Sequence, residues 1–474
     1  MVFSSMVFLW IFLPIVIVLS FLTRNIKAQN IMLLIASLIF YAWGEPTYIF
    51  LLLASIIMNW ALGIGIERFE KYKNQLLVLD IIGNLLVLGY FKYCNFAINT
   101  LDHLIPILHL SRTNIALPIG ISFFTFRAMS YVIDLYRGHY KAQKNILNLG
   151  LYISFFPQLL AGPIVKYRDI NEQITVRTVN REKMVAGFRK FIYGLGKKVI
   201  ISNLLSVAVD NIFALDFSQM TSLMAWCGAI FYTIQIYYDF SGYSDMAIGL
   251  SKMFGFDVAE NFNYPYISSS IREFWRRWHI SLSSWFKEYL YIPLGGNRKG
   301  TFHTYLNLFI VFAVTGLWHG ASWNFVGWGL YHGFFIIIER MGFGKILDKS
   351  KVFSRIYCMI VVMVGWIFFR VESVSMGLHV IARMVMPWKY QTSAVAIGTL
   401  VSAPALIAGI IGIIGCGMLQ KIFSCNKFSG FAVKWKNSLP EAIYCCLIFL
   451  YCILLLANNT YNPFIYFRFR EVSF

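Results

Sequence analysis

Residues 306–338 read LNLFIVFAVTGLWHGASWNFVGWGLYHGFFIII, two apolar runs joined by a short segment that carries His319. An ionisable side chain in such a setting is costly, because a charged group at the centre of a membrane helix costs about 2.5–3.5 kcal/mol on insertion scales. Histidine is tolerated since it can stay neutral, and it can still exchange a proton near neutral pH. The stretch therefore predicts a helical membrane protein with proton-transfer chemistry within or beside the bilayer.

The composition of the whole chain is also that of an integral membrane protein. Of its 474 residues, 58% are hydrophobic and 13% are charged, whereas soluble domains carry about 25% charged residues. The net charge of +19 comes from bases in short loops between apolar runs, which favours contact with the headgroups of a lipid bilayer over binding of nucleic acid. The eight cysteines show no CxxC spacing, so we expect buried thiols and neither disulfides nor a metal site.

Apolar runs long enough to cross, or nearly cross, a bilayer recur along the chain. They lie at about 6–22, 30–43, 47–66, 75–91, 116–135, 147–165, 190–213, 221–250, 303–318, 323–338, 355–371, 394–419 and 441–457. Several are shorter than the roughly 20 residues of a full crossing or are broken by glycine and proline. The pattern predicts an all-α integral membrane bundle of about 11 transmembrane helices plus re-entrant or interfacial helices, in one domain over residues 1–474.

The distribution of bases predicts the orientation of this bundle. Arg24 and Lys27 follow the first apolar run, a base-free turn follows the second, and residues 67–73 bring further bases after the third. Because basic loops stay in the cytoplasm, this alternation predicts a multi-pass protein of the cytoplasmic membrane with an extracellular N-terminus.

A second informative segment, residues 271–291, reads IREFWRRWHISLSSWFKEYLY. Apolar and aromatic residues at 275, 278, 282, 285 and 289 form one helical stripe, and residues 272, 276, 279, 283 and 287 form a second, mostly basic one. The spacing predicts one interfacial helix with His279 on its basic face, between Arg276 and Ser283.

Two interpretations of this segment remain open. It is either an interfacial anchor only, or its bases Arg276, Arg277 and Lys287 hold an anionic donor such as a phosphorylated carrier or coenzyme A, with His279 lining the path. In the second case Arg276 and Ser283 are also candidates for the lining of a substrate channel. A similar choice concerns Gln235 and Asp239, polar residues inside an apolar run. They belong either to a structural network between helices or to a substrate channel, because buried polar groups need partners.

The motifs FWRRWHISLS at 274–283 and WHGASWNF at 318–325 resemble the membrane-bound O-acyltransferase (MBOAT) family. NFNYPY at 261–266 and NPFIYFRF at 462–469 are similar to its bacterial alginate O-acetylase-like branch. The resemblance covers nearly the whole chain, and two histidine motifs at this spacing are highly specific.

The resemblance implies a bundle around a central funnel or tunnel, with His319 as the catalytic histidine and His279 as the second family histidine. It implies an acetyl group taken from a cytoplasmic donor, acetyl-coenzyme A, which acts as a substrate and not as a permanently bound cofactor. It further implies transfer to an extracellular or cell-wall polysaccharide in bacteria, through an SGNH-hydrolase-like partner and the glycan synthesis machinery.

The residues around His319 fit such chemistry. Acyl transfer to a hydroxyl needs a base, and a positioned histidine contributes about 10²–10⁴-fold. It also needs donors for the developing oxyanion, for which Trp318, Ser322 and Asn324 are nearby candidates. Because no serine or cysteine stands in a nucleophile-elbow motif, direct transfer is favoured over an acyl-enzyme.

Two alternatives stay open from the sequence. The same fold could carry a D-alanyl transferase for teichoic acids, fed by a carrier protein. The second alternative is a non-enzymatic transporter with a buried proton relay. Many transporter folds contain internal repeats, so the absence of a detectable repeat weighs against this alternative.

Overall fold

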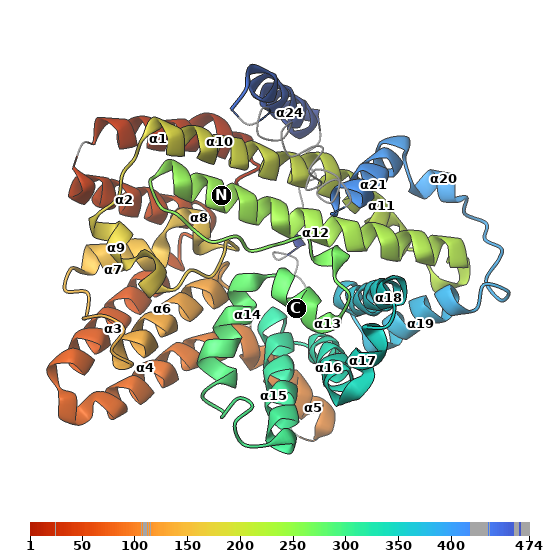
Figure 1. Ribbon diagram of the computed structural model, residues 1–474, viewed down its shortest axis with the longest axis horizontal. Coiled ribbons are helices and arrows are strands. Elements are labelled where there is room, and N and C mark those ends of the chain that lie inside the picture. Colours follow the sequence, from red (N-terminus) through yellow and green to blue (C-terminus); the bar gives the residue numbers. More distant parts are fainter. Residues whose placement is uncertain are drawn as a thin grey trace. The chain divides into compact units, whose positions relative to one another are not determined.

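The computed structural model describes residues 1–23, 25–105, 107, 111, 113, 115–417, 435, 437–458, 464 and 465. In these residues the chain forms helices and loops and no β-strand. It divides into two compact units, the first built from Met1–Phe191 and Tyr243–Glu260 and the second from Ile192–Gly242 and Asn261–Ile465. Two long helices, α10 (Arg181–Gly196) and α12 (Ser222–Met253), contribute residues to both units (Figure 1).

The first unit holds the N-terminal helices. These are α1 (Leu13–Leu22), preceded by the π-helical turn Phe8–Phe12, α2 (Ile26–Gly44), α3 (Ile49–Arg68), α4 (Lys73–Leu88), α5 (Cys94–Leu104), α6 (Ile121–Tyr136), α7 (Ile146–Ser154), α8 (Phe156–Leu159) and α9 (Tyr167–Thr175). Helix α2 begins where the Asn25 side chain accepts a 2.9 Å hydrogen bond from the backbone N–H of Lys27, which satisfies one of the donors that a helix start leaves open.

Aromatic rings join the first helices of this unit. The buried rings of Phe8, Phe40 and Phe156 come from three different elements, and the centroids of Phe40 and Phe156 lie 5.5 Å apart. Phe12 packs edge-on against Phe156 at 5.3 Å. Such offset and edge-to-face contacts add to the burial of apolar area, so the N-terminal helix is fixed to the core of its unit.

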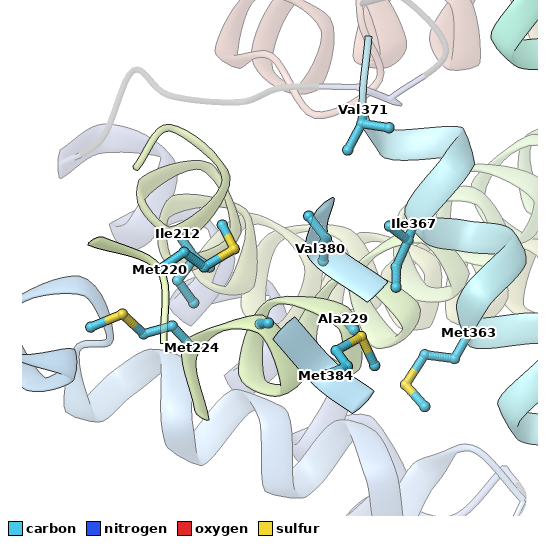
Figure 2. Close-up of a cluster of buried hydrophobic side chains, with 10 residues drawn as sticks. Ile212, Met220, Met224, Ala229, Met363, Ile367, Val371, Val380 and Met384 are labelled. Carbon is cyan, nitrogen blue, oxygen red and sulfur yellow. The ribbon is translucent and has the colours of Figure 1, made fainter. Parts of the chain in front are cut away.

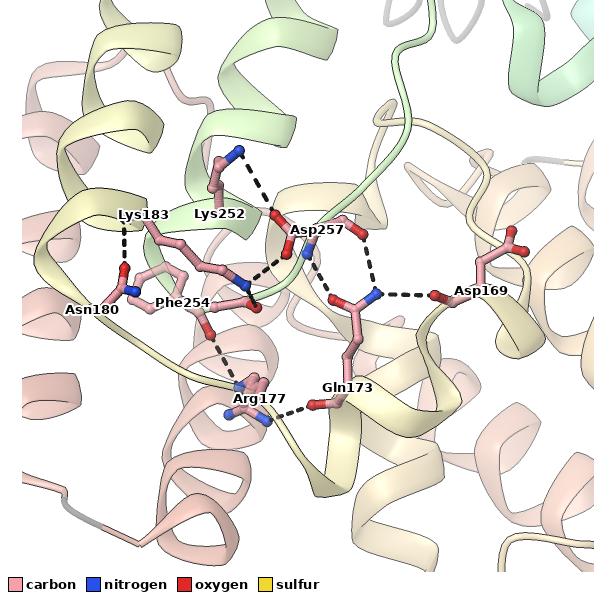
Figure 3. Close-up of polar contacts among 9 residues, drawn as sticks. Asp169, Gln173, Arg177, Asn180, Lys183, Lys252, Phe254 and Asp257 are labelled. Atoms are coloured by element: carbon pink, nitrogen blue, oxygen red, sulfur yellow. Dashed lines mark hydrogen bonds and ion pairs between the residues drawn. The ribbon is translucent and has the colours of Figure 1, made fainter. Parts of the chain in front are cut away.

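A polar network in the first unit fixes the loop between α9 and α10 (Figure 3). The Arg177 guanidinium donates to the carbonyl of Phe254 at 3.1 Å, and the Lys183 ammonium lies 2.6 Å from the Asp257 carboxylate. The Gln173 side chain accepts from the backbone N–H of Asp257 at 2.7 Å. The polar stretch that follows α9 is therefore bound to the residues that follow α12.

The second unit holds the remaining helices. These are the π-helical segment Lys197–Ser202, α11 (Asn203–Phe213), α13 (Ile271–Arg277), α14 (Ile280–Phe286), the π-helical turn Lys287–Tyr291, α15 (Thr301–His319), α16 (Trp323–Ile338), the π-helical turn Glu339–Phe343, α17 (Gly344–Leu347), α18 (Lys351–Arg370), α19 (Val374–Val385), α20 (Ile397–Leu400), α21 (Ala403–Gly415) and α24 (Leu439–Asn458).

One core of the second unit is rich in methionine (Figure 2). It joins α11, the start of α12, α18 and α19 through buried side chains of Ile212, Met220, Met224, Ala225, Ala229, Met363, Ile367, Val371, Val380 and Met384. Unbranched methionine side chains fill irregular gaps between helices. The indole N–H of Trp226 donates to the carbonyl of Met384 at 3.0 Å, so a polar contact accompanies the apolar packing.

Seven helical segments of the described chain are long and apolar enough to cross a membrane. They are Ile26–Gly44, Ile49–Arg68, Glu70–Leu104, Arg181–Phe213, Thr301–His319, Lys351–Arg370 and Leu439–Asn458, and Phe8–Leu22, Val374–Val385 and Ala403–Gly415 are shorter apolar helices. The prediction of an all-α, multi-span membrane fold is confirmed. The count of about 11 crossings, the central tunnel, the single domain and the extracellular N-terminus stay predictions.

Two sequence features lie wholly or partly outside the described residues. Arg24, one of the bases used to predict the orientation, is one of them. Of the motif at 462–469, only Phe464 and Ile465 are described, and both side chains are buried.

Candidate active site

His319 lies at the tip of a helical hairpin. Helices α15 and α16 run side by side (Figure 1), and α15 ends at His319. Their backbones approach so closely that a Cβ on Gly316 would overlap the carbonyl oxygen of Phe325, and one on Gly329 that of Phe312. Glycine is needed at both positions because only hydrogen fits in the space. The hairpin therefore holds His319 on a rigid support, between the helices formed by the two predicted apolar runs.

Aromatic rings surround the His319 imidazole, which is 4% exposed. Its ring centroid lies 5.0 Å from that of Trp318, 5.0 Å from that of Trp328 and 5.4 Å from that of Phe369. Such walls exclude water, and electrostatic interactions strengthen in the low dielectric they create.

The predicted continuous helix over 271–291 is wrong. Helix α13 ends at Arg277, α14 begins at Ile280, and His279 between them has φ 44° and ψ 56°, in the left-handed region. Because that conformation is uncommon for a residue with a side chain, outside contacts must hold it. The backbone N–H of Asn263 donates to the Arg277 carbonyl at 2.9 Å, and that of Ile280 to the Asn261 carbonyl at 3.0 Å.

The break moves His279 away from the basic face on which the spacing placed it. Its side chain is fully buried, packs perpendicular to the Phe240 ring at 4.7 Å and lies 6.2 Å from the Trp318 ring. Burial lowers the pKa of His279 to about 3, so its imidazole is neutral at physiological pH. His279 and His319 thus both contact the same indole, that of Trp318.

A cavity of about 640 Å³ is lined by the broken segment, the hairpin and the residues that follow α16. Its lining includes the bases Arg272, Arg276, Lys287 and Arg340, the acids Glu339 and Asp348, the polar residues Ser283 and Thr315, and the apolar Trp275, Leu282, Phe286, Val311, Phe312 and Ile336. Three residues predicted from the sequence, Arg276, Ser283 and Lys287, therefore share one cavity.

Trp275 connects the cavity lining with the rings around His319. It lines the cavity, and its ring lies 5.7 Å from that of Trp328, which contacts His319, and 5.2 Å from that of His332. His332 is fully buried and also contacts Trp328, at 5.2 Å. The Trp275 ring thus belongs to both the cavity lining and the aromatic cluster that contains His332 and Trp328.

Glu339 orients the basic segment and was not found from the sequence. Its carboxylate accepts hydrogen bonds from the backbone N–H groups of Ile271, at 2.6 Å, and Arg272, at 3.1 Å, at the start of α13. Burial raises the pKa of this carboxyl. The only signal in the sequence is an acid directly after a long apolar helix, which is too common to identify a role.

Other predicted site residues have structural partners. Arg277 does not line the cavity; its guanidinium donates to Glu273 at 2.9 Å and to the Asn263 carbonyl at 3.1 Å. Its predicted part in donor binding is therefore not supported. Asn324 donates both amide hydrogens to the carbonyls of Phe368 and Val371, which leaves no amide N–H for an oxyanion. Ser322 is half-buried at the start of α16.

Asp239 belongs to a buried polar network, the structural alternative left open above. Its carboxylate lies 2.5 Å from the Lys198 ammonium and accepts from the backbone N–H of Ile465 at 2.8 Å. The Asp239 and Lys198 side chains are 1% and 2% exposed. Gln235, also on α12, is 2% exposed. The structure does not bring either Asp239 or Gln235 to the cavity lining.

Comparison with known proteins gives a consistent family. Residues 141–381 match the model of the membrane-bound O-acyltransferase family. The chain is 39% identical to "Probable alginate O-acetylase AlgI" of Pseudomonas putida, over 99% of this chain and 100% of that protein. It is 34% identical to the peptidoglycan O-acetyltransferase of Helicobacter pylori, over 81% and 80%. Against the teichoic acid D-alanyltransferase of Bacillus subtilis it is 29% identical, over 45% and 56%. The chain belongs to the membrane-bound O-acyltransferase family and is an O-acyltransferase of the membrane.

Proposed function

We propose that this enzyme moves an acetyl group from cytoplasmic acetyl-coenzyme A across the cytoplasmic membrane to hydroxyl groups of an extracellular or cell-wall polysaccharide. The observation that carries the proposal is the pair of buried histidines in contact with Trp318, linked through Trp328 and Trp275 to a cavity with both bases and apolar walls. The full-length similarity to an alginate O-acetylase and the shorter one to a peptidoglycan O-acetyltransferase support a glycan as the acceptor.

In the proposed reaction, His319 is the general base. It takes the proton of the acceptor hydroxyl while the hydroxyl oxygen attacks the thioester carbonyl. The new C–O bond forms, the C–S bond breaks, and the proton passes to the leaving thiolate. A histidine held in place contributes about 10²–10⁴-fold to such a step. Since the Asn324 amide is engaged elsewhere, the role of oxyanion donor is left to Trp318 and Ser322.

The cavity suits the donor in size and chemistry. Its volume of about 640 Å³ falls in the usual range for small-molecule sites, about 300–1,000 Å³. Arg276, Lys287 and Arg340 supply positive charge for phosphate groups, and Trp275 and Phe312 supply an apolar wall for the uncharged arm that carries the thioester. We propose that this arm approaches the histidines along the Trp275 side.

An SGNH-hydrolase-like protein and the glycan synthesis machinery are the proposed partners, on the outer side of the membrane. A D-alanyl transferase fed by a carrier protein is the second candidate, supported by the similarity to the Bacillus subtilis enzyme. That similarity covers less than half of this chain, whereas the O-acetylase similarity covers nearly all of it, so acetyl transfer is preferred. A non-enzymatic transporter is not supported, because the family is one of enzymes.

The test is transfer of radiolabelled acetyl groups from acetyl-coenzyme A in proteoliposomes, with and without a candidate SGNH-type protein. We expect label in the partner or glycan with wild type, and loss of label with His319→Ala and His279→Ala. His303→Ala is the matched control, since His303 is an exposed histidine on the same helix as His319. Full activity of His319→Ala would refute the mechanism, and transfer from a D-alanyl carrier in place of acetyl-coenzyme A would favour the second candidate.

A further inference from the structure

The Asn261 side chain lies directly against the His279 imidazole. Its Oδ1 atom is 3.2 Å from His279 Nδ1, 3.1 Å from the backbone nitrogen of Ser281 and 2.9 Å from the Ser281 hydroxyl. Asn261 is 1% exposed, so these contacts lie away from bulk water. The same residue also accepts, through its backbone carbonyl, the hydrogen bond that stabilises the break at His279.

These contacts decide which nitrogen of His279 carries the proton. A backbone N–H can only donate, so the atom of Asn261 that faces Ser281 must be the carbonyl oxygen and not the amide nitrogen. The same oxygen faces Nδ1, and two lone pairs at 3.2 Å would repel each other. Nδ1 must therefore be the N–H donor.

The Ser281 hydroxyl leads to the same assignment. It lies 3.4 Å from Nδ1 and donates its hydrogen to Asn261 Oδ1, which leaves a lone pair facing the imidazole. A neutral histidine with its proton on Nδ1 has an unprotonated Nε2. Among the described residues, no group forms a hydrogen bond with Nε2, although the atom is buried.

We propose that Asn261 is a positioning residue of the acyl-transfer site: it holds neutral His279 as the Nδ1–H tautomer, so that Nε2 meets the substrate as a hydrogen-bond acceptor. The substrate group at this point must then be a hydrogen-bond donor. A second hydroxyl of the glycan, next to the one that His319 deprotonates, is such a donor, and a thioester carbonyl is not. This assignment of the substrate group rests on the proposed function, while the tautomer itself does not.

The contacts of His279 within the described chain are with uncharged groups. They are Phe240 of α12, Phe262 and Asn261 of the preceding segment, Ser281 of α14 and Trp318 of α15. None of them titrates in the physiological range, so the hydrogen bond from Nδ1 is the contact that sets the tautomer.

The first test measures the tautomer without any need for activity. Protein with ¹⁵N-labelled histidine is reconstituted in lipid bilayers, and solid-state NMR distinguishes protonated from bare ring nitrogens. We expect the His279 imidazole to carry hydrogen on Nδ1 only, which identifies its signal as one that is absent in His279→Ala. In Asn261→Ala this signal should change to a mixture with the Nε2–H form. A wild-type His279 with its proton on Nε2, or one unchanged in Asn261→Ala, would overturn the proposal.

The second test links the tautomer to the reaction. Asn261→Ala should lower kcat about tenfold or more, with a smaller change in KM, because the acceptor nitrogen is only partly available. Asn261→Asp keeps the acceptor oxygen and adds a carboxylate, which raises the pKa of His279. Since the neutral form is needed, the acidic limb of its pH–rate profile should move to higher pH.

Asn263→Ala is the matched control, because Asn263 lies in the same segment with an exposed side chain. Its kcat and pH profile should equal those of wild type. Wild-type kinetics in Asn261→Ala would overturn the positioning role. If wild type transferred no acyl group from any donor, the proposed function would fail, and the NMR result would still decide the tautomer.

Discussion

Replacement of Gly329 by alanine should damage the site from a distance. The added Cβ would overlap the Phe312 carbonyl and come within 3.1 Å of Gly316 Cα. Because both neighbours are backbone atoms, a change of side-chain rotamer cannot relieve the clash. The helices α15 and α16 would have to separate by roughly 1 Å to restore van der Waals distances.

The magnitude follows from two opposing terms. Overpacking of this kind costs about 1–3 kcal/mol, and alanine in place of glycine inside a helix returns about 0.5–1 kcal/mol. A net loss of about 1–2 kcal/mol of stability remains. The effect on catalysis should be larger, since misplacement of a catalytic group by about 1 Å can cost 10²-fold, and His319 lies at the tip of this hairpin.

The comparison is with Gly327→Ala on the same helix. A Cβ at Gly327 would meet only Val374, at 4.0 Å, so that variant keeps the helix propensity gain without the clash. Thermal unfolding in detergent and acetyl transfer in proteoliposomes measure both effects. Equal stability and equal activity of Gly329→Ala and Gly327→Ala would refute the idea that close backbone packing positions His319.

Three further predictions concern charged residues. Asp239→Asn should destabilise the protein by about 3–5 kcal/mol, because it leaves the Lys198 ammonium buried without its counter-charge. A thermal unfolding temperature of this variant equal to that of wild type would contradict the prediction. Lys287→Ala should raise KM for acetyl-coenzyme A about tenfold with little change in kcat. Arg277→Ala should leave this KM unchanged. Equal kinetics of the two variants would argue against the cavity as the donor site. Burial raises the pKa of Glu339, so the folded state binds its proton more tightly than the unfolded state. Wild-type stability should therefore fall as the pH rises from the ordinary carboxyl pKa through the raised one. This fall should be smaller in Glu339→Gln, and parallel pH–stability curves of the two proteins would count against it.

The hairpin at the site could be predicted from hydropathy alone. The expected runs at 303–318 and 323–338 agree with α15 and α16 to within two residues. Their lengths and their apolar character depend only on local sequence, and so does the short segment between them that carries His319. The family motifs added the second histidine, and the structure places both histidines against Trp318.

The surroundings of His279 could not be predicted in this way. No glycine or proline marks the break between α13 and α14, and the helical spacing continues through it. The break depends on Asn261, 18 residues earlier, and the start of α13 depends on Glu339, 68 residues later than Ile271. Helical periodicity carries no information on such long-range hydrogen bonds, so the amphipathic pattern gave the wrong face.

The antiparallel hairpin also has a consequence for the sidedness of the chain. Helix α15 is about 28 Å long, at 1.5 Å per residue, and α16 runs beside it in the opposite direction. The start of α15 at residue 301 and the end of α16 at residue 338 therefore lie at the same end of the pair. The pair therefore leaves the parity of membrane crossings unchanged, however deep its tip reaches. Topology reporters inserted just before α15 and just after α16 should therefore both lie on the same side of the membrane. His319 lies at the opposite end of the hairpin from these two positions.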